Sequence, residues 1–196
     1  RNLGTIGSAG PHWTVAHKGL TNGMNGGSNA RKIHLSLTQA EGTNSHGCVS
    51  AVSSTTFTLK DGSSGAAPRA HVNESSGNYV AYVFSEVAGY SKFGSYRGNG
   101  NANGTFVYTG FRPAWVLMKR TDSTGNWFII DNKRDPFNEV TKDLVPNSSS
   151  AETDNPNFID FLSNGFKLRT TGTSVNSGTI IYLAFAESPF KNSRAR

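Results

Sequence analysis

An internal repeat constrains the fold of this chain more than any other sequence feature. Four short segments of the first half recur in the second half in the same order, with spacings that differ by only a few residues. The matched pairs are residues 13–18 with 127–132, 54–60 with 163–169, 72–77 with 175–178, and 79–86 with 180–187. We therefore expect two copies of one fold in tandem, a first repeat over residues 1–90 and a second over residues 91–190, followed by a short basic tail over residues 191–196.

The local sequence within each copy is typical of short β-strands. Residues 114–119 and 127–131 are β-branched and aromatic runs that flank a turn-forming cluster, so they predict a hairpin. Residues 92–97 and 105–108 flank a stretch rich in Gly and Asn and predict another hairpin. No long stretch shows a 3.6-residue apolar period, and residues 157–162 come nearest to a helical turn.

The expected fold class is all-β, with two tandem related β-sandwich domains of a jelly-roll-like kind. Of the 196 residues 22 are Gly and 16% are charged, against about 25% charged in a typical domain, and the difference is made up by residues that suit turns. A single cysteine, Cys48, excludes an intrachain disulfide framework and a zinc site with several thiolates. No apolar run reaches the roughly 18 residues of a membrane helix, so we expect no membrane insertion.

The first copy is expected to lack its opening strands. It has no counterpart of residues 92–119 of the second copy, and a sandwich without these strands would leave sheet edges unpaired. We expect the chain to be the C-terminal piece of a longer polypeptide, with the missing strands supplied by residues before Arg1 or by an adjacent chain. The alternative is a repeat that diverged at its N-terminus.

Residues 79–84 and their twin, residues 180–185, carry apolar side chains on both faces of an expected strand. An antiparallel sheet with one face in water should instead alternate apolar and polar residues. We therefore expect the second face to be covered by a long loop of the same domain, by the neighbouring repeat or by another subunit.

A net charge of +6 invites a nucleic-acid interpretation, because nucleic-acid-binding domains carry clustered Lys and Arg. Here the excess is spread along the chain, apart from Lys191, Arg194 and Arg196 in the tail. We expect a solvated basic surface that aids solubility, and no nucleic-acid partner.

Candidate catalytic groups are few. All five histidines lie in the first copy, and the second copy has none. His46 and Cys48 could pair a base with a nucleophile, but nothing in the sequence marks an oxyanion hole, so a structural cysteine is the expectation. Asp154, Asn155 and residues 131–135 offer oxygen ligands for calcium without the alternating pattern of a calcium loop. We expect no catalytic residue, no metal site and no cofactor.

Binding residues are expected on the loops that differ most between the two copies, because loops on a rigid scaffold carry much binding function. These loops cover residues 21–31 and residues 135–157. The tryptophans at matched positions, Trp13 and Trp127, are expected in the core. The expected contact residues are Asn22, Met24, Asn25, Arg134, Phe137 and Asn138.

The second copy also resembles a known family. The resemblance is carried by residues 93–100, 106–120, 126–129 and 184–191. These segments resemble the C-terminal repeats of tail-fibre and other virion structural proteins of marine tailed bacteriophages, including cyanophage-like ones. The resemblance implies a component of the virion surface and offers no catalytic motif.

The expected function is a non-enzymatic tail-fibre or appendage module that presents loops to a host surface, with glycan as the expected receptor. The expected partners are further copies of the chain in a homotrimer, and the upstream part of the same polypeptide or other virion proteins. Several weak contacts on one particle would raise the avidity. The alternatives are a capsid or tail decoration module that binds other virion proteins, and an enzyme that trims surface polysaccharide with a pair of carboxylates.

Overall fold

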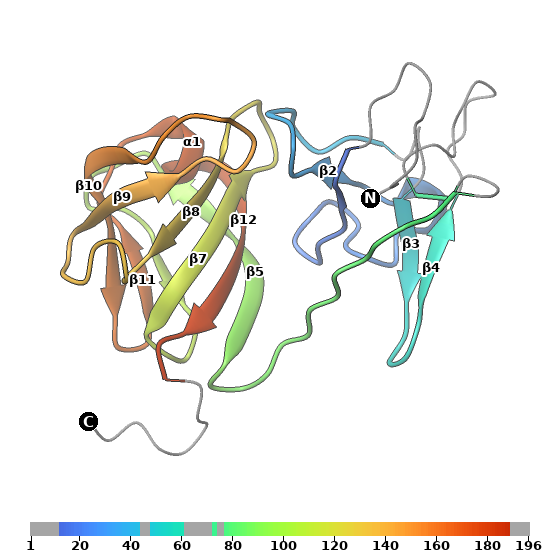
Figure 1. The fold of residues 1–196 in the computed structure, drawn as a ribbon, viewed down its shortest axis with the longest axis horizontal. Coiled ribbons are helices and arrows are strands. Elements are labelled where there is room, and N and C mark those ends of the chain that lie inside the picture. The colour runs from blue at the N-terminus through green and yellow to red at the C-terminus, as the bar shows by residue number, and fades with distance from the viewer. Residues whose placement is uncertain (1–11, 44–47, 61–71, 74–76, 189–196) are drawn as a thin grey trace. The chain divides into compact units, whose positions relative to one another are not determined.

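The computed structural model describes residues 12–43, 48–60, 72–73 and 77–188, shown as a ribbon in Figure 1. It confirms the all-β prediction, because nearly all regular structure in these residues is strand. The chain divides into two compact units, Arg1–Val83 (the first unit) and Phe84–Arg196 (the second unit). The division thus falls a few residues before the repeat boundary predicted after residue 90, and the basic tail lies outside the described residues.

The described part of the first unit contains two separate two-stranded sheets. One antiparallel pair joins β1 (Thr14–Val15) to β2 (Ile33–His34), and another joins β3 (Cys48–Val52) to β4 (Phe57–Lys60). A short 3-10 turn, η1 (Gly27–Asn29), lies between β1 and β2 in the sequence.

The second unit contains one eight-stranded sheet with the order β5-β12-β7-β8-β9-β10-β11-β6, in which all neighbours are antiparallel. The sheet curls until its two end strands approach, since the Thr105 hydroxyl donates to the Arg97 carbonyl over 2.8 Å. One helical turn, α1 (Thr173–Asn176), precedes the last strand. The strands are β5 (Ser91–Asn99), β6 (Phe106–Tyr108), β7 (Pro113–Arg120), β8 (Trp127–Asp131), β9 (Val140–Leu144), β10 (Thr153–Leu162), β11 (Gly165–Leu168) and β12 (Ser177–Ala186).

One predicted hairpin is confirmed and the other is wrong. β7 and β8 pair antiparallel from Trp115 opposite Asp131 to Lys119 opposite Trp127, as the flanking turn residues predict. β5 and β6, however, do not pair with each other: β5 pairs with β12 along its whole length, and β6 pairs with β11. Strand β12 is long enough to pair with all of β5, and Gly98 of β5 lets the chain approach at a point where a Cβ would collide with the Asn176 backbone.

The strand predicted at residues 79–84 is wrong for this structure. Residues 80–86 form no strand, and the side chains of Tyr82, Val83 and Phe84 are 71%, 75% and 57% exposed. The matched residues of β12 form a strand because β5 and β7 lie on either side of them, as Figure 1 shows. In the described part of the first unit, Tyr79 forms a single β-bridge and residues 80–83 belong to no strand.

Two further stretches, the near-helical residues 157–162 and the expected single loop over residues 135–157, contain strand residues instead. Residues 157–162, the nearest to a helical turn in the sequence, belong to strand β10. The expected binding loop over residues 135–157 is not one loop, because it contains β9 and the start of β10. Val140 and Asp143 of β9 are buried, and the Asp143 carboxylate accepts a hydrogen bond from the Thr153 hydroxyl over 2.9 Å, which joins β9 to β10.

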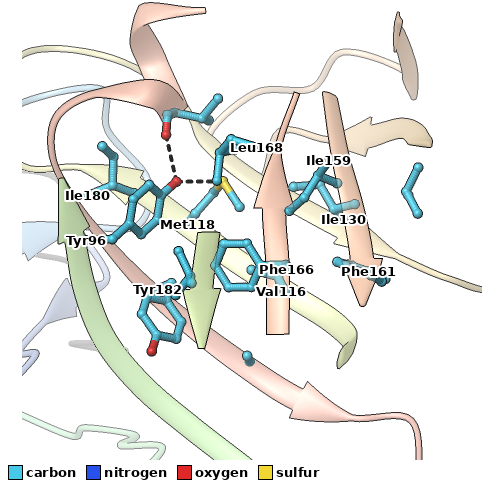
Figure 2. Packing of buried hydrophobic residues seen from close by; sticks show 14 of the residues in the cluster. Tyr96, Val116, Met118, Ile130, Ile159, Phe161, Phe166, Leu168, Ile180 and Tyr182 are labelled. Carbon is cyan, nitrogen blue, oxygen red and sulfur yellow. Dashed lines mark hydrogen bonds between the residues drawn. The ribbon is translucent and has the colours of Figure 1, made fainter. Parts of the chain in front are cut away.

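A single hydrophobic cluster fills the inside of the curled sheet (Figure 2). From β12 it takes Ile180, Tyr182 and Ala184, the alternate residues of that strand. The ring of Phe166 meets the rings of Tyr96 and Tyr182 edge-on, with centroids 5.9 and 5.5 Å away. The Tyr96 hydroxyl is fully enclosed and donates to the Val175 carbonyl over 2.6 Å, and burial raises the pKa of this phenol far above its ordinary value.

The outer face of the sheet is also apolar where β12, β7 and β8 meet. Ile181 and Trp127 are completely buried there, on either side of Lys119. The Lys119 ammonium donates to the carbonyl of its neighbour Arg120 over 2.6 Å, and burial lowers its pKa to about 8. The outer-face ring of Phe185 contacts Phe84 and Tyr90, so a connecting segment of the same unit supplies part of the predicted cover.

Candidate functional site

A surface hollow lies in the second unit, where the edge of β5 faces the edge of β6. We call this line the seam. The hollow has a volume of about 450 Å³ and is open to solvent. The segment before and at the start of β5 forms one wall, and the end of β6 with the residues after it forms the other. The lining residues are Glu86, Ala88, Gly89, Ser91, Lys92, Tyr108, Thr109 and Gly110.

The wall next to β5 is held by a tight turn over residues 85–91. The backbone N–H groups of Tyr90 and Ser91 both donate to the Val87 carbonyl over 2.9 Å, and Gly89 has a φ of 77°, which favours glycine. The Ser91 hydroxyl donates to the Ser85 carbonyl and accepts from the Val87 N–H. The turn therefore presents its side chains from a fixed backbone.

One carboxylate and one ammonium face the hollow from this wall. Glu86 and Lys92 form an ion pair over 3.4 Å, with both side chains partly exposed. The Glu86 carboxylate also accepts the backbone N–H of Phe93, which points away from β12 toward the seam, over 2.9 Å. Because two donors hold this carboxylate, its orientation is set before any ligand arrives.

The opposite wall carries an exposed aromatic ring. Tyr108, the last residue of β6, is 64% exposed and lines the hollow. The N–H groups of Thr109 and Gly110 both donate to the Asn164 carbonyl, and the Thr109 hydroxyl donates to the Phe111 carbonyl over 2.6 Å. The backbone below the Tyr108 ring is therefore fixed on both sides.

A cluster of aromatic rings surrounds the start of β5 on the outer face of the sheet. Neighbouring rings in it lie 5.6 to 6.4 Å apart between centroids, mostly edge-on or tilted. Phe84 and Tyr90 leave 57% and 43% of their surface exposed. The cluster consists of Phe84, Tyr90, Phe93, Trp115 and Phe185.

This arrangement suits non-covalent binding of a polar ligand with apolar faces. Tyr108 offers a ring face, while Glu86 and Lys92 offer a fixed acceptor and a donor. Glu86 is the one carboxylate in the lining, whereas two-carboxylate glycoside hydrolysis requires a pair across the cleft. Among the described residues no group of three His, Cys, Asp or Glu side chains could hold a metal ion. In the same part of the chain, no helix is long and apolar enough to span a membrane.

In the first unit two of the three expected contact residues, Asn22 and Asn25, bond to the local backbone. The Asn22 side chain donates to the Asn29 carbonyl over 2.9 Å, and Asn22 itself has a φ of 66°. The side-chain oxygen of Asn25 accepts the backbone N–H of Val52 over 2.7 Å. Met24 is half-buried. These residues lie together on one loop, but the two asparagines already hold it in place.

In the second unit the expected contact residues divide between backbone support and solvent. The Arg134 guanidinium lies 2.7 Å from the Asp131 carboxylate. Burial alone would raise the pKa of Asp131, but hydrogen bonds from the Arg134 and Lys133 N–H groups and from the Arg134 side chain outweigh it and lower this pKa. The Asn138 amide exchanges two hydrogen bonds with the Phe161 backbone, of 2.9 and 3.0 Å. Phe137 points into solvent, 79% exposed.

Sequence reasoning missed the seam hollow. None of its lining residues is among the six expected contact residues. The hollow depends on β5 pairing with β12, about 80 residues later in the chain. The one local signal is Tyr108, an aromatic residue followed by Thr109 and by Gly110, which has a φ of 85°. This signal does not predict a hollow by itself, because the residues of the opposite wall come from the segment around the start of β5.

Comparisons with known proteins identify one family. A family model described as Domain of unknown function (DUF7483) matches residues 5–189. No curated protein and no solved structure matches the chain.

Proposed function

For this chain, which belongs to the family described as Domain of unknown function (DUF7483), we propose a role as a non-enzymatic attachment module of a bacteriophage tail fibre or appendage. In this proposal the module is displayed on the virion surface and binds host-surface glycan in the seam hollow. The observation that carries the proposal is the exposed Tyr108 ring opposite the fixed Glu86–Lys92 pair. The resemblance of residues 93–100, 106–120, 126–129 and 184–191 to virion fibre repeats supports the assignment to a virus particle.

Sugar rings match the chemistry of the two walls. The C–H groups on one side of a pyranose can lie on the negative face of an aromatic ring, while its hydroxyls need donors and acceptors of fixed direction. Tyr108 supplies the ring, Glu86 accepts and Lys92 donates. A hollow of about 450 Å³ that opens to solvent has room for one or two sugar residues of a longer chain.

Weak binding at each hollow would suffice in an oligomer. We propose that the module acts as a homotrimer, so that each particle presents many identical sites. Linked sites raise the overall avidity by about 10²- to 10⁴-fold when they engage together. The expected signature is therefore binding to clustered glycans that is far tighter than binding to a single soluble one.

The test compares two exposed aromatic residues of the same strand. Tyr108 lines the hollow, whereas Phe106, 43% exposed on β6, does not. We expect Tyr108→Ala to weaken binding of the full chain to an array of bacterial surface glycans by about three- to tenfold per site, since ring stacking contributes about 0.5–1.5 kcal/mol. Phe106→Ala should bind as the unmodified chain does. Equal binding by both variants, or no glycan bound by the unmodified chain, would refute the site.

A decoration module that binds other virion proteins is the second candidate, and Phe137 favours it. This ring is 79% exposed on a connection whose backbone is anchored through Asn138, an arrangement suited to a protein contact. Purified particles carrying Phe137→Ser would distinguish the candidates. Loss of the protein from the particle supports decoration, whereas normal incorporation with unchanged host adsorption supports attachment through the seam hollow, which Phe137 does not line.

A further inference from the structure

The chain contains five Asn-Gly dipeptides, and this dipeptide can modify itself in water. The backbone nitrogen that follows an asparagine can attack the amide carbon of that asparagine's side chain, and a glycine in the second place carries no side chain that obstructs the attack. The attack requires a backbone N–H that is not held in a hydrogen bond, because a bonded nitrogen keeps its direction and its proton. The five asparagines are Asn22, Asn25, Asn99, Asn103 and Asn164.

Four of the five glycines are held by hydrogen bonds or by a strand ladder. Gly165 lies in β11, opposite Tyr108 of β6 on one side and Leu162 of β10 on the other. A held nitrogen can attack only after the bonds around it have opened, which costs free energy. The other three N–H groups donate to carbonyls, that of Gly23 to Leu20 over 2.8 Å, that of Gly100 to Asn176 over 2.6 Å and that of Gly104 to Leu168 over 3.1 Å.

Gly26 differs from these four glycines. Among the described residues, no group accepts a hydrogen bond from its backbone N–H, although its carbonyl accepts the Asn29 N–H over 2.8 Å. Packing requires glycine at this position, since a Cβ would lie 2.7 Å from the Ala30 Cα. The preceding residue, Asn25, is exposed, so water reaches its amide. The Asn25–Gly26 dipeptide therefore combines a free nitrogen with an accessible side-chain amide.

The hydrogen bond that Asn25 makes is placed in favour of the attack. Its side-chain oxygen accepts the backbone N–H of Val52, at the end of β3, over 2.7 Å. Negative charge develops on this oxygen while the new bond forms, and a backbone donor stabilises such a charge. In Asn22, by contrast, the bonded atom is the nitrogen that would have to leave, which donates to the Asn29 carbonyl over 2.9 Å.

We infer that Asn25 is a self-modification site, at which the chain converts its own side-chain amide into a carboxylate. The Gly26 backbone nitrogen gives up its proton and forms a bond to the Asn25 side-chain amide carbon. The bond from that carbon to the side-chain nitrogen breaks, and ammonia leaves with the proton. Water then opens the cyclic imide and leaves an aspartyl or an isoaspartyl residue at position 25. This inference does not depend on the glycan proposal.

The modification changes how the loop over residues 21–31 is held to β3. The aspartyl product keeps an oxygen for the Val52 N–H and adds a negative charge. The isoaspartyl product brings the side-chain methylene into the main chain, so Gly26 can no longer keep its close approach to Ala30 while position 25 stays bonded to Val52. The isoaspartyl form therefore loosens the loop from β3.

The experiment compares the five dipeptides within one molecule. The full chain is kept in neutral buffer, and a parallel sample is kept unfolded in urea. Peptide mass spectrometry measures the exchange of an amide for a carboxylate at each asparagine, and an isoaspartyl methyltransferase with a labelled methyl donor detects the isoaspartyl form. In the folded chain Asn25 should react at least about tenfold faster than each of the other four, because their glycines must first open. In urea all five should react at similar rates, since folding no longer distinguishes them.

Two variants and one structural measurement complete the test. Asn25→Gln should abolish the reaction at this position, because its longer side chain would have to close a larger ring, whereas Asn103→Gln should leave the rate at Asn25 unchanged. Hydrogen exchange of the Val52 amide should become faster as the isoaspartyl form accumulates, and should stay constant in Asn25→Gln. An Asn25 that stays intact in the folded chain while all five asparagines react in urea would overturn the inference. Reaction in the folded chain at Asn22 or Asn103 as fast as at Asn25 would overturn it too.

Discussion

The two units contain related strand pairs but differ in what those pairs can build. In the second unit, the four neighbouring strands β8 to β11 are part of a larger sheet, which continues through β7 and β12 to β5 on one side and to β6 on the other. This sheet curls around one hydrophobic cluster. In the first unit, the pairs β1–β2 and β3–β4 remain separate. Pairing of neighbouring strands is therefore encoded locally in both units, whereas closure of the sheet also depends on long-range pairs, such as β12 with β5 and with β7.

The buried residues show the same difference. All sixteen residues of the hydrophobic cluster belong to the second unit, among them three aromatic rings that contact one another. The buried apolar residues described in the first unit are smaller and fewer, namely Leu20, Ala30, Ile33, Cys48 and Val72. Isolated two-stranded pairs are marginally stable in water. We therefore expect the first unit to open well before the second.

The largest expected effect comes from removing the same aromatic residue from each unit. Phe166→Ala should lower the free energy of unfolding of the second unit by about 3–5 kcal/mol, because the ring is completely buried among Tyr96 and Tyr182. Phe57→Ala, at the matched position, should cost less than about 1 kcal/mol, because Phe57 is 41% exposed. Urea denaturation followed by circular dichroism and hydrogen exchange would measure both. Equal losses would show that the two units have equally packed cores.

The next effect concerns a buried lysine that each unit contains. Burial lowers the pKa of Lys119 and of Lys32 from 10.5 to about 8, and the nearby Cys48 partly opposes this for Lys32. Between these pH values the unfolded chain keeps a proton that the folded chain has released, so the contribution of each lysine to stability should rise with pH from about 8 toward 10.5. In the first unit, the raised pKa of the buried Cys48 thiol acts in the opposite direction above its ordinary value of 9.0.

Replacing either buried lysine by a neutral residue should raise the stability of its unit at neutral pH, because the folded chain then no longer buries an ammonium group. Lys119→Met should stabilise the second unit at pH 7 by about 1–3 kcal/mol, and Lys32→Met should do so for the first unit. Melting followed at pH 7 and at about pH 9.5 should show a smaller rise with pH in the variant than in the unmodified chain. An unchanged rise would mean that these two lysines do not cause it.

The smallest effect compares two tyrosine hydroxyls. Tyr96→Phe removes the donor to the Val175 carbonyl and should cost about 1–2 kcal/mol, since that carbonyl is left without its partner. Tyr82→Phe in the first unit should change the stability by a few tenths of a kcal/mol, because the residue is 71% exposed. Chemical denaturation of both variants would measure the two changes in the free energy of unfolding. A cost for Tyr82→Phe as large as that for Tyr96→Phe would mean that residues 79–83 are already packed.

The features that the sequence predicted correctly are those that residues close together in the chain determine. The all-β class and the β7–β8 hairpin follow from short apolar runs with turn residues between them. The pairing of β5 with β12 joins positions such as Phe93 and Leu183, and local propensity carries no information on it. Residues 79–84 show the same limit, because a sequence suited to a strand forms one only beside a partner.

The candidate site was harder to predict than the fold. The expected contact residues Asn25 and Asn138 were chosen as polar loop residues, but their amides instead bond to the backbone of neighbouring strands. Short polar side chains often do so, since they mimic backbone groups. Tyr108 and Glu86 face the same hollow although 22 positions separate them, so no motif links them. Phe137 is exposed, and its role stays a prediction.

The only cysteine of the chain gives a way to time the opening of one unit alone. Cys48 is completely buried in β3 of the first unit, and burial raises the pKa of its thiol. A thiol-specific reagent can therefore react only when this unit opens, and it adds one label per chain. The labelling rate therefore reports how often the first unit opens. The second unit has no thiol and does not contribute to this rate.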